Sequence, residues 1–269
     1  MLNSLISLSK QGFSGQWGKQ ACSDCRQQYA CVGCSWLGRK AYRKFLLERV
    51  LHKKVALTQR MIQGSLKHEV LARESGAREY KLDNRYFWNK LHDERKVRLA
   101  EGHICSYVLG LNGHPDQMNI QIKKNPLRIF FDIRERKGRW YKTYWLQAYA
   151  YGLIVADPRF MLGEEQFYDK LGLDFASVNV DVTLEPYYSE KYAKTVTLIR
   201  NGKLVKPELK FGVQKQRRRY LDLIDGGKAE TLPMCEPCNP EDHCGFMEYC
   251  KESLLLKQVT LKSFGVKQK

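Results

Sequence analysis

Eight of the nine cysteines lie in two clusters whose spacing is typical of metal ligands. The two clusters, one near the start of the chain and one near its end, are Cys22, Cys25, Cys31 and Cys34, and Cys235, Cys238, Cys244 and Cys250. The four thiolates of the first would form a closed tetrahedral Zn2+ site, and the second would then hold another metal. Disulfide pairing is the ordinary alternative, but clustered cysteines in a reducing compartment are more often metal ligands.

Charged residues follow an apolar strand pattern in the segment "LRIFFDIRERK". Alternate residues of a strand share a face, so Asp132 would lie beside Arg134. On the other face, Glu135 would lie beside Lys137. A carboxylate and a cation placed together in this way would suit a metal-dependent hydrolytic centre. The ordinary alternative is a charged strand end.

Four further polar residues in the middle of the chain suit a catalytic or metal site. His68 follows Gly64 by four residues in a helical pattern, and Asp116 follows a glycine-containing turn before a strand. Gln147 and Tyr151 are four residues apart in a helical pattern, which places them on one helix face. Each residue taken alone has an ordinary explanation, because helical histidines are often structural and Asp is common at turns.

The composition favours an anionic partner. The chain has 46 Lys and Arg against 29 Asp and Glu, a net charge of +17, and such a surplus attracts polyanions at long range. Nucleic acid is the favoured partner and an anionic membrane surface the second. The longest apolar run, "AYAYGLIVA", is well short of the roughly 20 residues that span a bilayer, and the first residues show no cleavable leader pattern. We therefore expect an intracellular, cytoplasmic protein without a membrane span.

The elements that must position these residues follow from the hydrophobic periodicity. We expect an α/β fold in which three strands, "HICSYVLGL", "DQMNIQI" and "LRIFFDI", precede the helix that carries Gln147 and Tyr151. Strands at "SVNVDVTLEPYY" and "KTVTLIR" and a basic helix near "QKQRRRYLDLI" come next. The expected parts are a cysteine-rich segment, a helical region, a core, the rest of the core with the basic helix, and a cysteine cluster with a basic tail, at 1–40, 41–100, 101–160, 161–230 and 231–269.

Taken in order, these motifs resemble the RecB-like branch of the PD-(D/E)XK nucleases, which includes the CRISPR-associated adaptation nuclease and exonuclease V. That branch has a Gly-x3-His helix, a Gly-x-x-Asp strand, a Glu/Asp-x-Lys strand and a Gln-x3-Tyr helix in the same order. The resemblance covers residues 20–250 of the chain. It implies a restriction-endonuclease-like core, a mixed sheet flanked by helices, with cysteine-rich metal-binding segments at both termini.

The resemblance implies a metal-dependent DNA nuclease, a single-stranded DNA exonuclease in DNA processing, repair or CRISPR adaptation. Asp116 and Asp132 would hold Mg2+ or Mn2+, and His68 would add a ligand. A lysine beside the metal would stabilise the phosphate, while Gln147 and Tyr151 would orient the site. Basic segments such as "KQRRR" would follow the phosphates of the bound strand.

The resemblance also implies a 4Fe–4S cluster. Iron–sulfur members of this branch end in C-x2-C-x5-C, and a fourth cysteine from near the N-terminus completes their cluster. Here Cys235, Cys238 and Cys244 match that ending. Cys34, just before the first expected helix, is favoured over Cys31 as the fourth ligand. The surplus of cysteines leaves Zn2+ binding by the others open.

One position departs from the family's pattern. If Asp132 is the acidic ligand, which its place directly after "LRIFF" favours, the lysine position holds Arg134, whose planar fork places its donors differently. An alignment moved by three residues gives Glu135 and Lys137, a complete pair that lies further from Asp116. The alternative function is therefore a catalytically impaired subunit with the nuclease fold. It would bind nucleic acid or partner proteins within a larger complex and keep structural zinc or iron–sulfur sites.

Overall fold

The structure, a computed structural model, describes residues 31–37, 45, 85–100, 102–134, 144–185 and 193–226. The chain divides into two compact units. The first is Met1–Gly38 with Ala72–Lys215, and the second is Arg39–Leu71 with Gln216–Lys269. In the second unit Phe45 packs edge-on against Tyr220, with ring centroids 4.8 Å apart. The sheets and the candidate site described below belong to the first unit.

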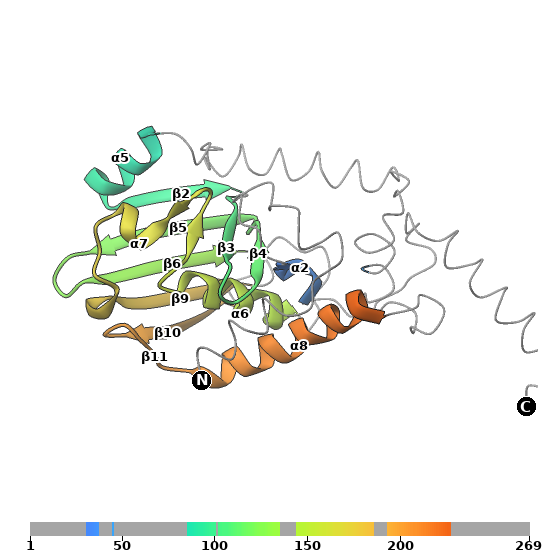
Figure 1. Cartoon of the computed structure of the whole chain (residues 1–269). Helices are drawn as coiled ribbons and strands as arrows, with labels where there is room; N and C mark the ends of the chain where they lie inside the picture. Colours follow the sequence, from blue (N-terminus) through green and yellow to red (C-terminus); the bar gives the residue numbers. More distant parts are fainter. Residues whose placement is uncertain are drawn as a thin grey trace, which may run out of the picture. The chain divides into compact units, whose positions relative to one another are not determined.

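The centre of the first unit is a six-stranded sheet in the order β11-β10-β9-β6-β5-β2 (Figure 1). Its strands in chain order are β2 (Lys96–Ala100), β5 (Gln117–Lys123), β6 (Arg128–Arg134), β9 (Asn179–Glu185), β10 (Lys194–Arg200) and β11 (Lys203–Leu204). Neighbouring strands are antiparallel except for β6 and β9, which run parallel. Since a parallel pair needs a long crossover connection, the chain must leave the sheet after β6 and return to it at β9.

That crossover contains the helix α6 (Tyr144–Val155), which is buried along most of its length. Its Gly152 packs against β9 and β10, because a Cβ added there would lie 3.7 Å from Leu184 and 3.0 Å from Leu198. The absence of a side chain at this position lets the helix approach the sheet closely. The helix thereby covers one face of the six-stranded sheet.

A second, five-stranded sheet has the order β1-β4-β3-β7-β8. Its strands are β1 (Val32–Gly33), β3 (Ile104–Ser106), β4 (Leu111–Gly113), β7 (Met161–Leu162) and β8 (Glu165–Gln166). The other elements are α2 (Cys34–Leu37), α5 (Arg85–Glu94), α7 (Phe167–Lys170), the 3-10 turn η3 (Phe175–Ser177) and α8 (Pro207–Gly226). Strand β1 pairs parallel with β4, and the remaining pairs of this sheet are antiparallel.

The two faces of the six-stranded sheet differ in polarity, as strict alternation along a strand requires. On one face, Phe131 of β6 is buried against Phe160 and Phe167, with ring centroids 6.0 and 5.6 Å away. Tyr168 lies next to these rings and donates a hydrogen bond to the carbonyl of Val155. Burial raises the pKa of Tyr168, and the nearby charge of Asp157 adds to the rise. The opposite face carries mostly polar and charged side chains.

The prediction of an α/β core, with a mixed sheet flanked by helices, is confirmed in this coarser form. Two local predictions are wrong. The segment "HICSYVLGL" is not one strand, because β3 and β4 are separated by a turn at 107–110. The helical pattern predicted for 41–100 does not reach its end, since Lys96–Ala100 is the edge strand β2. Pairing with β5 decides this short segment, whose alternation is too brief to identify it alone.

No helix among the described residues is long and apolar enough to cross a membrane.

Candidate functional site

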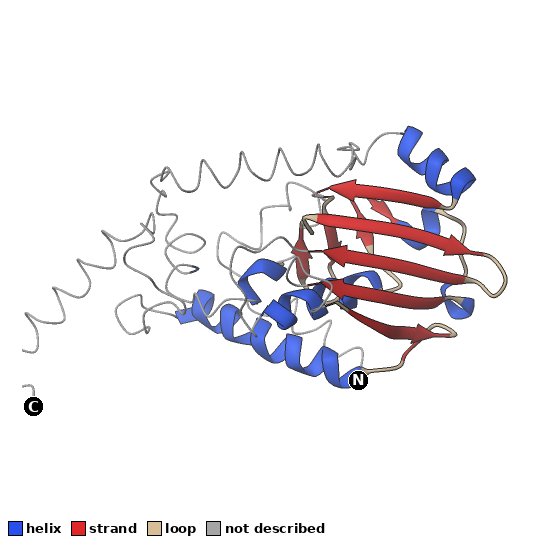
Figure 2. Ribbon diagram, turned by 180° about the vertical axis from the view of Figure 1, so that it is seen from behind, coloured by secondary structure: helices blue, strands red, loops and turns tan. Residues whose placement is uncertain are grey.

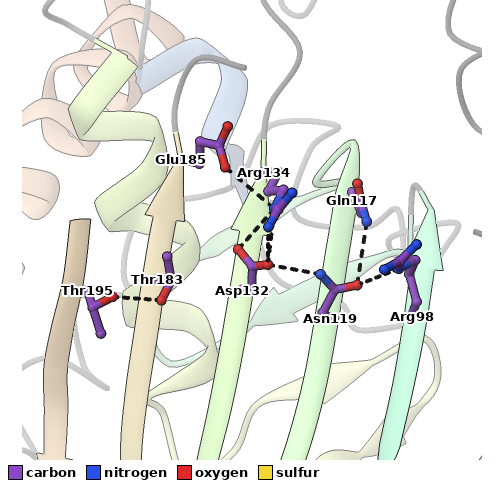
Figure 3. A network of polar contacts seen from close by, with 8 residues as sticks. All are labelled: Arg98, Gln117, Asn119, Asp132, Arg134, Thr183, Glu185 and Thr195. Atoms are coloured by element: carbon purple, nitrogen blue, oxygen red, sulfur yellow. Dashed lines mark hydrogen bonds and ion pairs between the residues drawn. The ribbon is translucent and has the colours of Figure 1, made fainter. Parts of the chain in front are cut away.

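Asp132 on β6 lies at the centre of a group of polar side chains on the polar face of the sheet (Figure 3). Its Oδ2 accepts from Arg134 Nε at 3.0 Å and lies 2.9 Å from Arg134 Nη2. Its Oδ1 lies 3.2 Å from the same Nε. Asn119 Nδ2, on the neighbouring strand β5, donates to Oδ2 at 2.9 Å. Both oxygens of this carboxylate are therefore engaged by side chains of the sheet.

Arg134 joins Asp132 to a second carboxylate. Its Nε lies 3.5 Å from Oε2 of Glu185, the last residue of β9. Arg134 and Glu185 are partners in the register of the parallel pair β6–β9, which explains why two residues distant in the sequence meet here. The Glu185 side chain is 5% exposed and that of Arg134 is 36% exposed. A carboxylate this deeply buried needs a cation beside it, because desolvation otherwise disfavours its charge.

The group continues across β5 to the edge strand β2. Arg98 Nε donates to Asn119 Oδ1 at 3.0 Å, and Gln117 Nε2 lies 3.5 Å from the same oxygen. The Asn119 amide thus accepts on one side and donates to Asp132 on the other. Arg98, Asp132, Arg134 and Glu185 carry two positive and two negative charges, so this part of the face is close to neutral.

A second set of predicted residues ties α6 to the loop that precedes β5. Gln147 Nε2 donates to the hydroxyl of Tyr151 at 3.2 Å, as expected for residues four apart on a helix. Tyr151 Oη lies 3.5 Å from the carbonyl oxygen of His114. Asp116 is half-buried two residues after His114 and directly precedes β5. The helix therefore packs against the segment that positions Asp116, and the prediction that Gln147 and Tyr151 share one helix face is confirmed.

Among the described residues, the contacts of Asp132 and Glu185 do not suit a site for Mg2+ or Mn2+. Such cations take oxygen ligands, preferably carboxylates with lone pairs to spare. Both Asp132 oxygens already face the guanidinium of Arg134, and Glu185 faces the same group. Within the described ranges, no three His, Cys, Asp or Glu side chains are grouped as metal ligands. A divalent cation at Asp132 would meet the positive charge of Arg134 at close range.

Several predicted residues lie outside the described part of the chain. They are His68, Glu135, Lys137, Cys22, Cys25, Cys235, Cys238, Cys244 and Cys250. Of the remaining cluster cysteines, Cys34 is fully buried in α2 and Cys31 is partly exposed just before β1. The ninth cysteine, Cys105, lies outside both clusters and is buried beside Met161 as an apolar filler. The proposed iron–sulfur and zinc ligand sets stay predictions.

Sequence reasoning missed four members of this group, namely Arg98, Gln117, Asn119 and Glu185. Asn119 had a signal, because it lies on the strand that follows Asp116 in a hairpin with the strand of Asp132. Glu185 lies within the predicted strand "SVNVDVTLEPYY" and is the last residue of β9, but only the parallel pairing of β6 with β9 brings it to Arg134. Arg98 had no signal, since its segment was predicted to be helical.

Comparison with known proteins adds no relative. No protein-family model matches the chain, and no curated protein matches it.

Proposed function

We propose that this protein binds nucleic acid on a nuclease-like core in which Arg134 has replaced the catalytic lysine, so that the site no longer supports metal-dependent hydrolysis. The observation that carries the proposal is the contact of one guanidinium with both Asp132 and Glu185. A lysine would present a single compact ammonium with three rotatable donors, whereas arginine holds a planar fork that is charged at all working pH values. The fork occupies the Asp132 carboxylate that a metal would need.

Charge supports nucleic acid as the partner. The chain carries +17, and the polar face of the sheet and α8 both present exposed basic side chains, among them Lys96, Lys123 and Lys215. Polyanions gain affinity from such groups by releasing counterions, independently of base sequence. The motif order described above favours DNA, and the restriction-endonuclease-like arrangement of the core is part of the same proposal.

Metal-dependent cleavage of single-stranded DNA is the competing proposal. It is supported by the order of the motifs and by the Gln147–Tyr151 contact beside the turn of Asp116. It would require Arg134 to leave Asp132, or the use of Glu135 and Lys137 instead. We rank nuclease activity second because it needs Asp132 as a metal ligand. The Asp132 carboxylate already contacts Arg134, whose positive charge would repel a divalent cation.

The two proposals separate in one experiment. The full chain, purified anaerobically to preserve any cluster, is incubated with end-labelled single-stranded DNA and either Mg2+ or Mn2+, while binding is followed in parallel. We expect binding in the micromolar range or tighter, with the DNA left intact over hours. Asp132→Asn serves as the matched control for contaminating nuclease. Degradation that disappears in Asp132→Asn would establish the nuclease, and failure of the wild type to bind would refute nucleic-acid recognition altogether.

A further inference from the structure

The polar face of the six-stranded sheet offers a broad surface formed by strands β2, β5, β6, β9 and β10. Figure 2 shows the sheet from the side opposite to Figure 1, with the flat of its strands toward the viewer. Helix α6 and the rings around Phe131 pack against the other face. Two rows of residues lie side by side in the register of this polar face. They are Lys96, Gln121, Phe130, Asp181 and Thr197, and Arg98, Asn119, Asp132, Thr183 and Thr195.

Phe130 is an aromatic residue in the middle of this otherwise polar face. Its neighbours along β6, Ile129 and Phe131, are 0% and 1% exposed on the apolar side, whereas Phe130 is partly exposed. The apolar core therefore does not account for its ring. A phenyl ring that stays in contact with water on a sheet surface is a ready platform for a flat apolar partner.

The surroundings of Phe130 define the charge of that partner. Lys123 Nζ lies over the ring at 5.0 Å from its centroid and Arg128 Cζ lies over it at 5.9 Å, so the ring makes two cation–π contacts, which a stacking base would have to displace. Lys96 lies in the same row on β2 and is exposed. Within the row of described residues that contains Phe130, Asp181 is the acidic member, and it pairs with Arg128 at 3.3 Å. The surroundings of the ring are positively charged, which disfavours a cationic partner. They favour a partner that combines flat rings with negative charge.

We propose that single-stranded DNA lies across this face, with one base stacked on Phe130 and adjacent phosphates held by Lys96 and Lys123. The inference rests on the proposed function and specifies where and in which form the nucleic acid binds. Base stacking on an aromatic side chain together with a positive groove is the usual mode of sequence-tolerant single-strand binding. A base can lay its face on this ring only when it is unpaired and unstacked from its neighbours, so duplex DNA cannot make this contact.

The Asp132–Arg134 group lies on the path of such a strand. Asp132 is two residues beyond Phe130 on β6, a distance of about 7 Å along an extended strand. Without a cation, Asp132 and Glu185 would repel the phosphates that follow the stacked base. Arg134 contacts both carboxylates, and together with Arg98 it balances their two negative charges, so the face stays permissive for a polyanion from Phe130 to the ends of β6 and β9.

The test compares Phe130→Ala with Phe130→Trp in the full chain, using a fluorescein-labelled thymine oligonucleotide and fluorescence anisotropy at low salt. Removing one stacked base costs about 1–3 kcal/mol, so Phe130→Ala should weaken binding by about 5- to 150-fold, while Phe130→Trp should bind at least as well as the wild type. The same sequence as duplex DNA should show little difference between these variants. Thermal unfolding of each variant verifies that the fold is retained.

A matched pair of lysine variants tests the phosphate contacts. Lys123→Ala should weaken binding several-fold, whereas Lys170→Ala should leave it unchanged. Lys170 lies on α7, whose Phe167 packs on the apolar side of the sheet, and it pairs with Glu165 at 2.8 Å.

The outcomes distinguish the two levels of the proposal. A wild type that does not bind DNA refutes the proposed function. A wild type that binds, with Phe130→Ala as tight as the parent or with losses equal on single strands and duplex, refutes the stacking platform alone. Equal losses in Lys123→Ala and Lys170→Ala would also overturn it, because binding would then depend on charge and not on this face.

Discussion

At the scale of single residues, Arg134 determines what the candidate site can do. Its guanidinium contacts the Asp132 carboxylate with two nitrogens and reaches Glu185 with one of them. The same residue type that makes the site unsuitable for a divalent cation also stabilises a carboxylate that is nearly inaccessible to water. The stability of the fold and the proposed binding therefore depend on the same side chain, and a substitution here should affect both.

Replacing Arg134 with Met should destabilise the protein by about 1–3 kcal/mol, because the buried Glu185 would lose its cation while keeping its desolvation cost. The partial exposure of Arg134 keeps the loss below that of a fully buried pair. Urea unfolding of the two proteins measures the difference. Adding Glu185→Gln to Arg134→Met should recover part of the loss, since the buried charge is then gone. Equal stability of the wild type and Arg134→Met would show that the pair contributes nothing.

At the scale of elements, helix α6 packs closely against strand β4 because Gly113 of β4 has no side chain. A Cβ added to Gly113 would lie 2.6 Å from Cε1 of Tyr151, whose ring is 1% exposed and cannot move aside freely. The same ring carries the hydroxyl that lies near the carbonyl of His114. Gly113 thus lets the helix approach the turn that leads to Asp116.

Gly113→Ala should cost about 1–3 kcal/mol of stability, as overpacking of a well-filled core does. Gly212→Ala is the matched control, because nothing lies within 4 Å of a Cβ added at this helical position of α8. There the change should be neutral or stabilise by up to about 1 kcal/mol, since Ala favours helices over Gly. The melting temperatures of the two variants measure the contrast. A fall of equal size in both would contradict the packing argument.

At the scale of the whole molecule, the net charge determines the long-range attraction of a polyanion. A surplus of 17 positive charges attracts a polyanion from any direction, but it does not select a base or a strand. Affinity from charge alone falls steeply with salt, whereas affinity from stacking does not. Salt dependence therefore separates the contribution of the net charge from that of the face around Phe130.

The logarithm of the binding constant for single-stranded DNA should fall with the logarithm of the salt concentration at a slope of about −2 to −3. Each neutralised phosphate contributes about −0.7, so this corresponds to three or four contacts. Lys96→Ala combined with Lys123→Ala should make the slope shallower by about 1.4, as the loss of two contacts requires. Anisotropy titrations between low and physiological salt measure it. A slope near zero would show that phosphate contacts play no part.

The sequence by itself determined the features that depend on local periodicity. Alternation placed Asp132 and Arg134 on one face of a strand, and helical spacing brought Gln147 to Tyr151. The α/β class of the core followed from the same kind of pattern, taken segment by segment. These outcomes need only the geometry of one element, which is set within a few residues.

Only the tertiary structure decided which strands are neighbours. Glu185 reaches Arg134 because β6 and β9 pair in parallel, and Asn119 reaches Asp132 because the β5–β6 hairpin has this register. Lys96–Ala100 became a strand through its pairing with β5, against the helical pattern of its surroundings. Pairing joins residues far apart in the sequence, and its free energy comes from burying one face of the sheet as a whole. Periodicity within one segment therefore does not reveal which strands pair with each other.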